Sequence, residues 1–258
     1  AVLERPGHVE QADRPGAVHR SWAMPRSNAP AGSTLCLALR ELVRFGRMFV
    51  AGGLAQDGTR LLSEEAITAM RTKQIDVPGV PGLLADRWGL GFELFDWGGE
   101  VYGHDGGTIG QSTFWRVVPG SDFVIAMSVN GGAAVGMIAD LALPLIREVT
   151  GLAVPDLPVP SEAPRAVDPA PYLGGYAGPM YTWEVAEAPE GLDVTLIPGE
   201  FMTSSGQTRT TTRFVHHAGH SFIAAEPKDG MHETITFVVG EDGRATHLHA
   251  GARTLRHV

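Results

Sequence analysis

A proline-rich segment past the middle of this 258-residue chain limits what the chain can fold into. Proline lacks a backbone N–H and fixes φ, so closely spaced prolines exclude both a helix and a central strand. The prolines of this segment are Pro155, Pro158, Pro160, Pro164, Pro169 and Pro171. The sequence therefore predicts two domains, 1–152 and 172–258, joined by a semi-rigid linker over 153–171.

Parts of the first domain carry the three- and four-residue spacing of amphipathic helices. One helix is predicted to start at Ser33 as its N-cap and to end before Gly52–Gly53. Its apolar stripe consists of Leu35, Leu39, Leu42, Phe45 and Phe49. Another follows Ser63, with acidic residues in its first turn, and a last helix over 133–150 should be kinked at Pro144. The stripe of this last helix is Val135, Ile138, Leu141, Leu145 and Val149.

Between the second and third helices the apolar residues alternate, as is typical of half-buried strands. One strand is predicted over 88–95, with Glu93 on the side opposite the apolar residues. Strands over 112–118 and 123–129 are predicted to pair antiparallel through a Pro-Gly-Ser-Asp turn. Helices and strands in this order predict an α/β layered domain, whereas residues 1–30 show no sustained period and predict no self-standing element.

Beyond Tyr172 the chain consists of short runs of β-branched and aromatic residues separated by turns. No helix of normal length fits this region. The second domain is therefore predicted to be all-β, either a barrel or a sandwich.

The composition excludes several classes of protein. A formal net charge of −9 argues against nucleic-acid binding, because phosphate contacts require clustered Lys and Arg. The single cysteine, Cys36, excludes an intramolecular disulfide and is predicted to be a small core residue. The sequence shows neither a bilayer-spanning run nor a secretion signal, so we expect no membrane partner and a cytoplasmic location.

The histidines of the second domain raise the question of a metal site. His247 and His249 share a strand face, and His216, His217 and His220 lie near another strand. No acidic residue is placed to support them as ligands. We therefore predict no metal and no cofactor, and interpret these residues as a solvated polar strand face.

The segment Tyr102–Gly110 places His104 among glycines between two strand-like runs. Glycines let a backbone turn sharply and approach a ligand closely, and histidine titrates near neutral pH. Together with exposed backbone N–H groups, these residues could handle protons and stabilise an oxyanion. The alternative is a glycine-rich hairpin that carries an incidental histidine.

Several segments, taken in order, carry a family resemblance. Pro30-Ala31-Gly32-Ser33-Thr34, followed by residues 42–48, is similar to a "P-A-G-G … D-L-A-R-F" helix. Residues 104–110 are similar to a K-T-G or H-x-G motif, and 123–130 with the helix after them to a closing strand and C-terminal helix. Over roughly residues 25–150 the chain thus resembles the serine β-lactamase and penicillin-binding-protein superfamily, especially class C β-lactamases, D-amino-acid peptidases, related esterases and penicillin-binding-protein-type thioesterases.

The resemblance implies a fold and a set of site residues. The fold is an incomplete β-lactamase-like antiparallel sheet with flanking helices, followed by a small lipocalin-like barrel. Residues Tyr172–Tyr176 resemble the start of that barrel domain. His104 stands where the family has Lys or His and would help to hold the proton network and the substrate's charge. The backbone N–H of Gly107 would form half of the oxyanion hole. The other implied substrate contacts are Asp105, Gly106 and Thr108. Trp115, which lies near the motif in sequence, either forms an apolar wall for an acyl group of the substrate or belongs to the core.

The chain departs from the family where the nucleophile is expected. The family uses Ser-x-x-Lys at a helix N-terminus, but Lys73 and Lys228 are preceded at that distance by Met70 and Ala225. The second family motif is matched only by residues 128–130, which follow the third motif instead of preceding it.

Three explanations remain open. In the first, the chain is the C-terminal part of a serine hydrolase whose N-terminal half, a separate chain or cleaved segment, carries Ser-x-x-Lys. In the second, it is a non-catalytic binding protein that retains the cleft. In the third, it uses a local serine, Ser33 or Ser112, as the nucleophile. On the first explanation, the expected reaction is hydrolysis or acyl transfer of an amide, ester or thioester through an acyl-serine, with a small acyl or peptide substrate.

Overall fold

A computed structural model of the chain describes residues 8–11, 14–18, 35–82, 84–108, 111–131, 134–204 and 207–258. The chain forms two compact units. One contains the described residues up to Asp76 together with Ala85–Pro155, and the other contains Val77–Leu84 and Asp156–Val258. Residues 153–171 contain neither helix nor strand.

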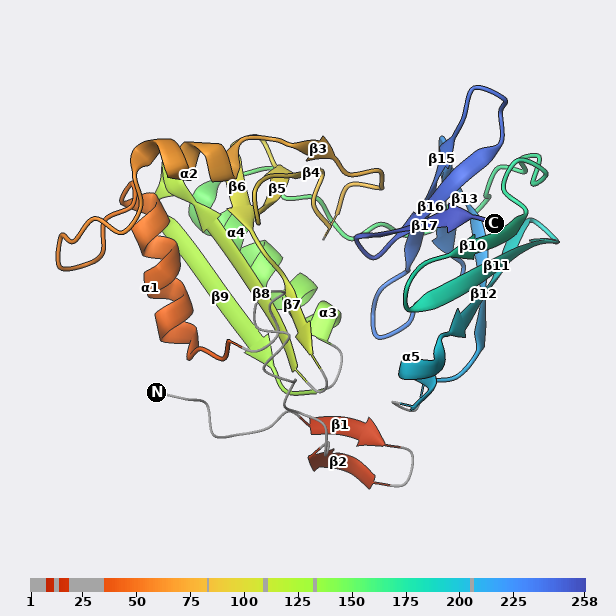
Figure 1. Cartoon of the computed structure of the whole chain (residues 1–258), viewed down its shortest axis with the longest axis horizontal. Helices are drawn as coiled ribbons and strands as arrows, with labels where there is room; N and C mark the ends of the chain where they lie inside the picture. Colours follow the sequence, from red (N-terminus) through yellow and green to blue (C-terminus); the bar gives the residue numbers. More distant parts are fainter. Residues whose placement is uncertain are drawn as a thin grey trace. The chain divides into compact units, whose positions relative to one another are not determined.

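A seven-stranded antiparallel sheet forms the centre of the first unit (Figure 1). Its order is β3-β4-β5-β6-β8-β7, and β9 pairs with β8. The strands are β3 (Ile75–Asp76), β4 (Arg87–Trp88), β5 (Glu93–Asp96), β6 (Glu100–Gly103), β7 (Gly106–Thr108), β8 (Gln111–Val118) and β9 (Phe123–Val129). The predicted α/β character of this part of the chain is confirmed.

The β8–β9 hairpin forms as the sequence predicts. A single 3₁₀ turn, η2 (Pro119–Ser121), joins the strands, and Asp122 follows in the left-handed conformation with φ 48°. Aspartate tolerates this conformation better than most residues, which suits the turn. The antiparallel register runs from Val118 opposite Phe123 to Ser112 opposite Val129.

The single strand predicted over 88–95 is wrong. The chain turns between β4 and β5, where Gly91 has φ +80° and the Gly89 N–H donates to the Phe92 carbonyl at 2.8 Å. Leu90, at the tip, is 51% exposed. The alternating pattern comes from two short paired strands, and the glycines that seemed to form one strand face instead make the turn.

Helix α1 (Leu39–Val50) packs on β8 and β9. It begins later than predicted: residues 35–38 are not helical, and Ala38 caps the helix in an extended conformation, while Ser33 lies outside the described residues. Leu35 is 79% exposed and Cys36 is also exposed, so the predictions that they are core residues are wrong. The predicted end is confirmed, since Gly52 and Gly53 follow with positive φ.

Helix α2 (Glu64–Arg71) has the predicted cap, because the Ser63 hydroxyl accepts the Ala66 N–H at 3.1 Å. The last helical run consists of α3 (Ala134–Met137), a π turn, η3 (Ile138–Ala142), and α4 (Leu143–Thr150). The π turn lies just before Pro144, where the predicted interruption is confirmed.

The apolar stripe predicted for this last run is mostly wrong. Leu141, Leu145 and Val149 are exposed, and Ile138 alone of the stripe is buried. The other buried positions are Ala142, Leu143 and Ile146. The π turn adds a residue to one turn and rotates the face that packs on the sheet.

The second unit contains a closed antiparallel barrel in which each strand pairs with its sequence neighbours and β10 pairs with β17 (Figure 1). The strands are β10 (Gly174–Ala177), β11 (Tyr181–Ala188), β12 (Gly191–Pro198), β13 (Thr210–Ala218), β14 (Ser221–Ala224), β15 (Thr234–Val239), β16 (Ala245–Ala250) and β17 (Arg253–His257). The predicted all-β barrel is confirmed. Its core is packed with large side chains, including Tyr176, Trp183, Phe214, Phe222 and Phe237.

Smaller elements complete the described structure. The N-terminal region forms an antiparallel pair, β1 (His8–Gln11) and β2 (Arg14–Val18), where the sequence predicted no element. The barrel unit also carries the short helix α5 (Glu200–Ser204). Across the described residues, no helix has the length and apolar character needed to cross a membrane.

Candidate active site

The glycine-rich segment forms one edge of the sheet. Strands β6 and β7 both pair with β8 and keep one register, with Gly103 opposite Arg116 and Gly106 opposite Thr113. His104 and Asp105 lie between the two strands, and the His104 N–H still donates to the Trp115 carbonyl at 3.3 Å. The segment is therefore a hairpin arm, and the strand predicted after it over 112–118 is confirmed as β8.

Antiparallel pairing sets the direction of each backbone amide on this arm. Residues of an antiparallel strand alternately turn their N–H groups toward and away from the paired strand. Because His104 faces β8, Asp105 and Gly107 face away. The Asp105 N–H accordingly donates to Glu93 Oε1 at 3.3 Å, and the Gly107 N–H points toward the side of β7 that no described strand covers.

Two glycines of the arm meet different surroundings. A Cβ on Gly103 would collide with the Trp115 carbonyl oxygen and lie 3.2 Å from Cα of Arg116, so only glycine fits where β6 crosses β8. A Cβ on Gly107 would meet no atom of the described residues within 4 Å. The backbone at Gly107 is thus open to an approaching group.

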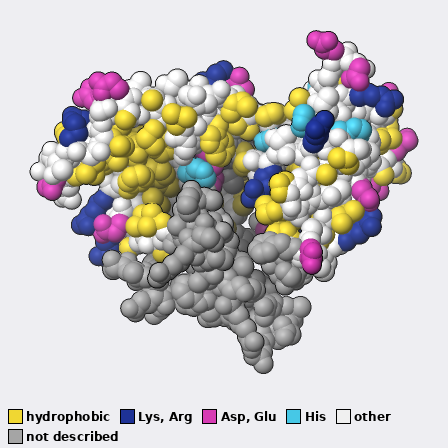
Figure 2. Space-filling model, in the orientation of Figure 1, with side chains coloured by type: hydrophobic (Ala, Val, Ile, Leu, Met, Phe, Trp, Pro, Cys, Tyr) yellow, Lys and Arg dark blue, Asp and Glu magenta, His cyan; other side chains and the backbone are white. Residues whose placement is uncertain are grey.

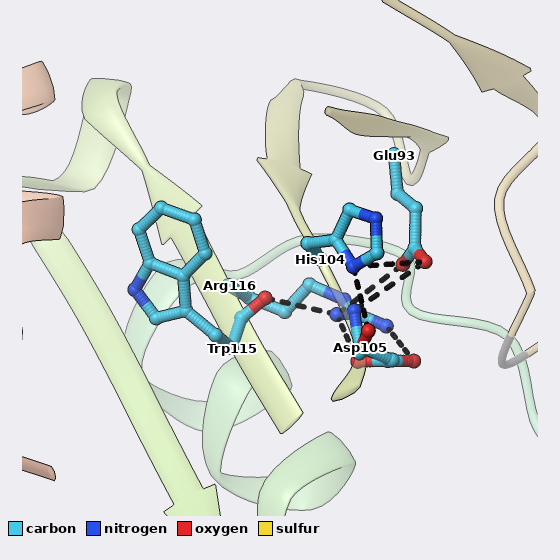
Figure 3. A network of polar contacts seen from close by, with 5 residues as sticks. All are labelled: Glu93, His104, Asp105, Trp115 and Arg116. Atoms are coloured by element: carbon cyan, nitrogen blue, oxygen red, sulfur yellow. Dashed lines mark hydrogen bonds and ion pairs between the residues drawn. The ribbon is translucent and has the colours of Figure 1, made fainter. Parts of the chain in front are cut away.

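The ring of His104 has a defined hydrogen bond. Its Nδ1 lies 2.6 Å from the backbone carbonyl oxygen of Asp105 (Figure 3). The ring also makes a T-shaped contact with Trp88, with ring centroids 5.5 Å apart. A carbonyl oxygen only accepts, so Nδ1 carries the proton in this contact. In the neutral ring, Nε2 is then the nitrogen with a free lone pair, and the side chain is 48% exposed.

The carboxylate of Asp105 is held by a buried arginine. Nη1 and Nη2 of Arg116 donate to its Oδ1 at 2.6 Å and Oδ2 at 3.0 Å, a bidentate pair. The Arg116 side chain is 0% exposed and lies between the rings of Phe95 and Phe114, with Cζ 4.1 Å from each centroid. This aspartate, predicted to contact substrate, is therefore engaged by a neighbouring strand.

Glu93 completes the network and is also buried, with a side chain 7% exposed. Its Oε2 lies 3.7 Å from Arg116 Nη1, and its Oε1 lies 3.9 Å from His104 Nδ1 (Figure 3). Burial raises the pKa of Glu93, and the Asp105 carboxylate raises it further, against the opposing effect of Arg116 and His104. The carboxyl groups of Glu93 and Asp105 thus share the guanidinium of Arg116. The imidazole of His104 is a second group there that can carry positive charge.

The other predicted site residues lie nearby in sequence but contribute differently. The Trp115 side chain is 4% exposed and packs on Phe45 and Phe49 of α1, so its ring lies in the core and its carbonyl reaches the site. The backbones of Gly106 and Thr108 belong to β7. Among the predicted contacts that the structure describes, the His104 side chain is 48% exposed and the Gly107 N–H points away from β8.

Sequence reasoning missed Glu93 and Arg116. The available signal was the position of Arg116 within the otherwise apolar run Phe114-Trp115-Arg116-Val117-Val118. An arginine in a strand buried on both faces needs a carboxylate partner. Asp105, just before β7 on the arm that pairs with β8, was one candidate for that partner.

Comparison with known proteins assigns the chain to a family. Residues 4–148 match the family model described as "Beta-lactamase". The chain belongs to the β-lactamase family. This membership covers the sheet, its helices and the hairpin arm that carries His104.

Individual relatives of this β-lactamase-family chain are longer. Penicillin-binding protein 4 of Amycolatopsis lactamdurans is 41% identical over 157 residues, which make up 60% of this chain and 41% of the relative. A crystal structure of SurE superposes with a TM-score of 0.65 at 29% identity, covering 98% of this chain and 55% of SurE. SurE with D-Leu gives 0.58 at 30% identity, covering 86% and 50%. The chain thus spans about half the length of these relatives.

Proposed function

We propose that this chain is the C-terminal part of a serine hydrolase or acyltransferase of the β-lactamase and penicillin-binding-protein type. It would act on an amide, ester or thioester through an acyl-serine intermediate. The direction of the Gly107 N–H carries the proposal, because a donor fixed on a paired strand needs no reorganisation when negative charge develops. His104 Nε2, on the same arm, is the group available to accept or hold a proton.

In this proposal the nucleophile and its lysine come from an N-terminal segment of the same hydrolase. The sequence contains no Ser-x-x-Lys, and the chain spans 41% of penicillin-binding protein 4 and 55% of SurE. Serine Oγ would attack the substrate carbonyl and pass its proton to the lysine; the oxyanion would accept from Gly107 N–H until the leaving group departs and the ester forms.

The outer edge of β9 supports the idea of a completing segment. The carbonyl of Trp115 points toward β6 and β7, because it accepts the His104 N–H. Its partner on β9, Ala126, therefore points its own N–H away from β8. Since the direction alternates along a strand, the N–H groups of Val124 and Ser128 also point away from β8. The strand Phe123–Val129 carries no charge and no proline, the devices that usually protect an edge strand. Figure 2 shows apolar side chains gathered on one face of this unit near α1 and α2. Phe45 of α1 is 45% exposed, and Leu61, between the two helices, is 60% exposed.

For the substrate, we propose an acyl or peptide compound that contains a D-amino-acid residue. The support is the structural likeness to SurE, of which one crystal structure is with D-Leu. We further propose that the barrel is lipocalin-like and acts as a scaffold, since its interior is occupied by its own side chains.

A covalent probe tests the proposal. Native material is treated with a β-lactam or a fluorophosphonate and examined by intact-mass spectrometry. We expect the label on a co-purifying polypeptide that contains Ser-x-x-Lys, in a complex with this chain. A single unlabelled species would exclude the catalytic proposal and favour the alternative, a binding protein that keeps the cleft; the absence of Ser-x-x-Lys from this sequence is what supports that alternative.

A further inference from the structure

The buried side chain of Arg116 fixes the position of Asp105 on the hairpin arm. The Arg116 guanidinium donates two parallel hydrogen bonds to the Asp105 carboxylate, which fix the direction of the carboxylate as well as its position. Arg116 itself cannot move easily, because Phe95 and Phe114 flank it and its Nη1 also donates to the Trp115 carbonyl at 2.9 Å. The side chain of Asp105 is thereby anchored to β8.

The backbone of Asp105 is fixed from its other side. Its N–H donates to Glu93 Oε1 on β5, so the residue is held by β8 through its side chain and by β5 through its amide. Its carbonyl oxygen is the acceptor for His104 Nδ1 at 2.6 Å. Because Asp105 is held through both its side chain and its amide, its carbonyl oxygen has a fixed position relative to the His104 ring.

We propose that Arg116 and Glu93 are positioning residues that act through Asp105 to keep His104 in the Nδ1–H form, with Nε2 free for proton transfer. The tautomer of His104 is inferred only from the contacts among Glu93, Asp105, Arg116 and His104. The effect of that tautomer on catalysis rests on the proposed function. Among the described residues, the groups that face His104 are Glu93 from β5, Asp105 and Arg116 beside it, and the uncharged ring of Trp88 from β4. Without the anchor, the ring would lose its acceptor and populate the Nε2–H form that free histidine favours.

The test measures the tautomer directly, in the chain as it exists. Long-range ¹H–¹⁵N spectra of the histidine ring are recorded at a pH where the ring is neutral. We expect one Nδ1–H form for His104 in the wild type, and a mixture or the Nε2–H form in Arg116→Lys, which keeps the charge but loses the two-pronged contact, and in Asp105→Asn. Arg44→Met, which removes an exposed arginine paired with Glu41 on α1, should leave the spectrum unchanged.

Arg116→Met leaves two carboxyl groups without their cation and is the variant most prone to unfold. The double variant Asp105→Asn/Arg116→Met removes both charges of the pair and keeps the measurement available. A wild-type Nε2–H form, or an Nδ1–H form that persists in Asp105→Asn and Arg116→Lys, would overturn the proposal.

Turnover separates this inference from the proposed function. In the complex with the Ser-x-x-Lys polypeptide, Arg116→Lys should lower kcat by ~10-fold or more with little change in KM, because proton transfer suffers and binding does not. A tautomer shift without any measurable acyl transfer would leave the positioning role standing and remove the proposed function. Wild-type turnover in variants whose tautomer has shifted would remove His104 Nε2 from the reaction.

Discussion

The sheet of the second unit is closed into a barrel, whereas the sheet of the first unit is open. In the barrel every strand has two neighbours, and the interior is filled with aromatic and aliphatic side chains. In the described part of the first unit, β3, β7 and β9 each have one strand neighbour. A closed sheet satisfies its own backbone, whereas open edges leave N–H and C=O groups for something else to pair. Gly107, one of the candidate site residues, lies on β7 at one of these open edges.

The largest expected effect comes from emptying the barrel core. Phe237 is 2% exposed and contacts Tyr172, Tyr176 and Phe222. Phe237→Ala should lower the free energy of unfolding by about 3–5 kcal/mol, because a closed barrel cannot collapse around the cavity. Ile125→Ala on half-buried β9 is the matched truncation and should cost about 1 kcal/mol. Urea denaturation measures both; equal losses would mean that β9 is as well packed as the barrel.

Hydrogen exchange should separate the edges from the closed sheet. The amides of Val124, Ala126 and Ser128 point away from β8, whereas those of Leu192 and Val194 lie in a strand with neighbours on both sides. We expect exchange on the order of 100-fold faster at the β9 positions. Adding the Ser-x-x-Lys polypeptide should slow exchange at these amides selectively, and protection equal to that of β12 in the isolated chain would argue against an open edge.

A glycine pair on the hairpin arm should show which positions tolerate a side chain. Gly103→Ala places a methyl group on the Trp115 carbonyl and should destabilise the first unit by about 1–3 kcal/mol. Gly107→Ala adds a methyl group in open space and should change stability little. Thermal unfolding of both variants provides the measurement, and similar melting temperatures would contradict the close crossing of β6 and β8.

The smallest expected effect depends on pH. The pKa of Glu93 is raised in the folded state, so folding favours its protonated form, and its contribution to stability is lost as pH rises above the unfolded value of about 4.3. Glu93→Gln should therefore gain stability relative to the wild type as pH rises above about 4.3. Denaturation curves across this range test the sign; a wild type that gains on the variant as pH rises would show that Arg116 and His104 outweigh burial.

Much of this fold could be predicted from local chemistry. Ser63 caps α2 because its hydroxyl reaches the third following amide, and the Pro-Gly-Ser-Asp turn joins β8 to β9 because each residue suits its position. The strands of the barrel follow from alternation with turns at regular intervals. These signals depend on residues close together in sequence.

The features that were missed depend on tertiary contacts. The stripe on the last helical run was wrong because a π turn changed its phase, and the strand over 88–95 was wrong because a tight turn can mimic alternation. Glu93 was placed on the outer face because charged residues are seldom buried. Its burial depends on Arg116, more than twenty residues further along the chain, and no local pattern shows that pairing.

The shared register of β6 and β7 also determines how this site could change in evolution or in design. Inserting one residue between His104 and Gly107 would turn the Gly107 amide back toward β8, because direction alternates along the strand. Inserting two would restore the direction but move the amide by about 7 Å along the sheet. Substitutions on this arm can adjust the chemistry gradually, whereas a change in its length would abolish the geometry in a single step.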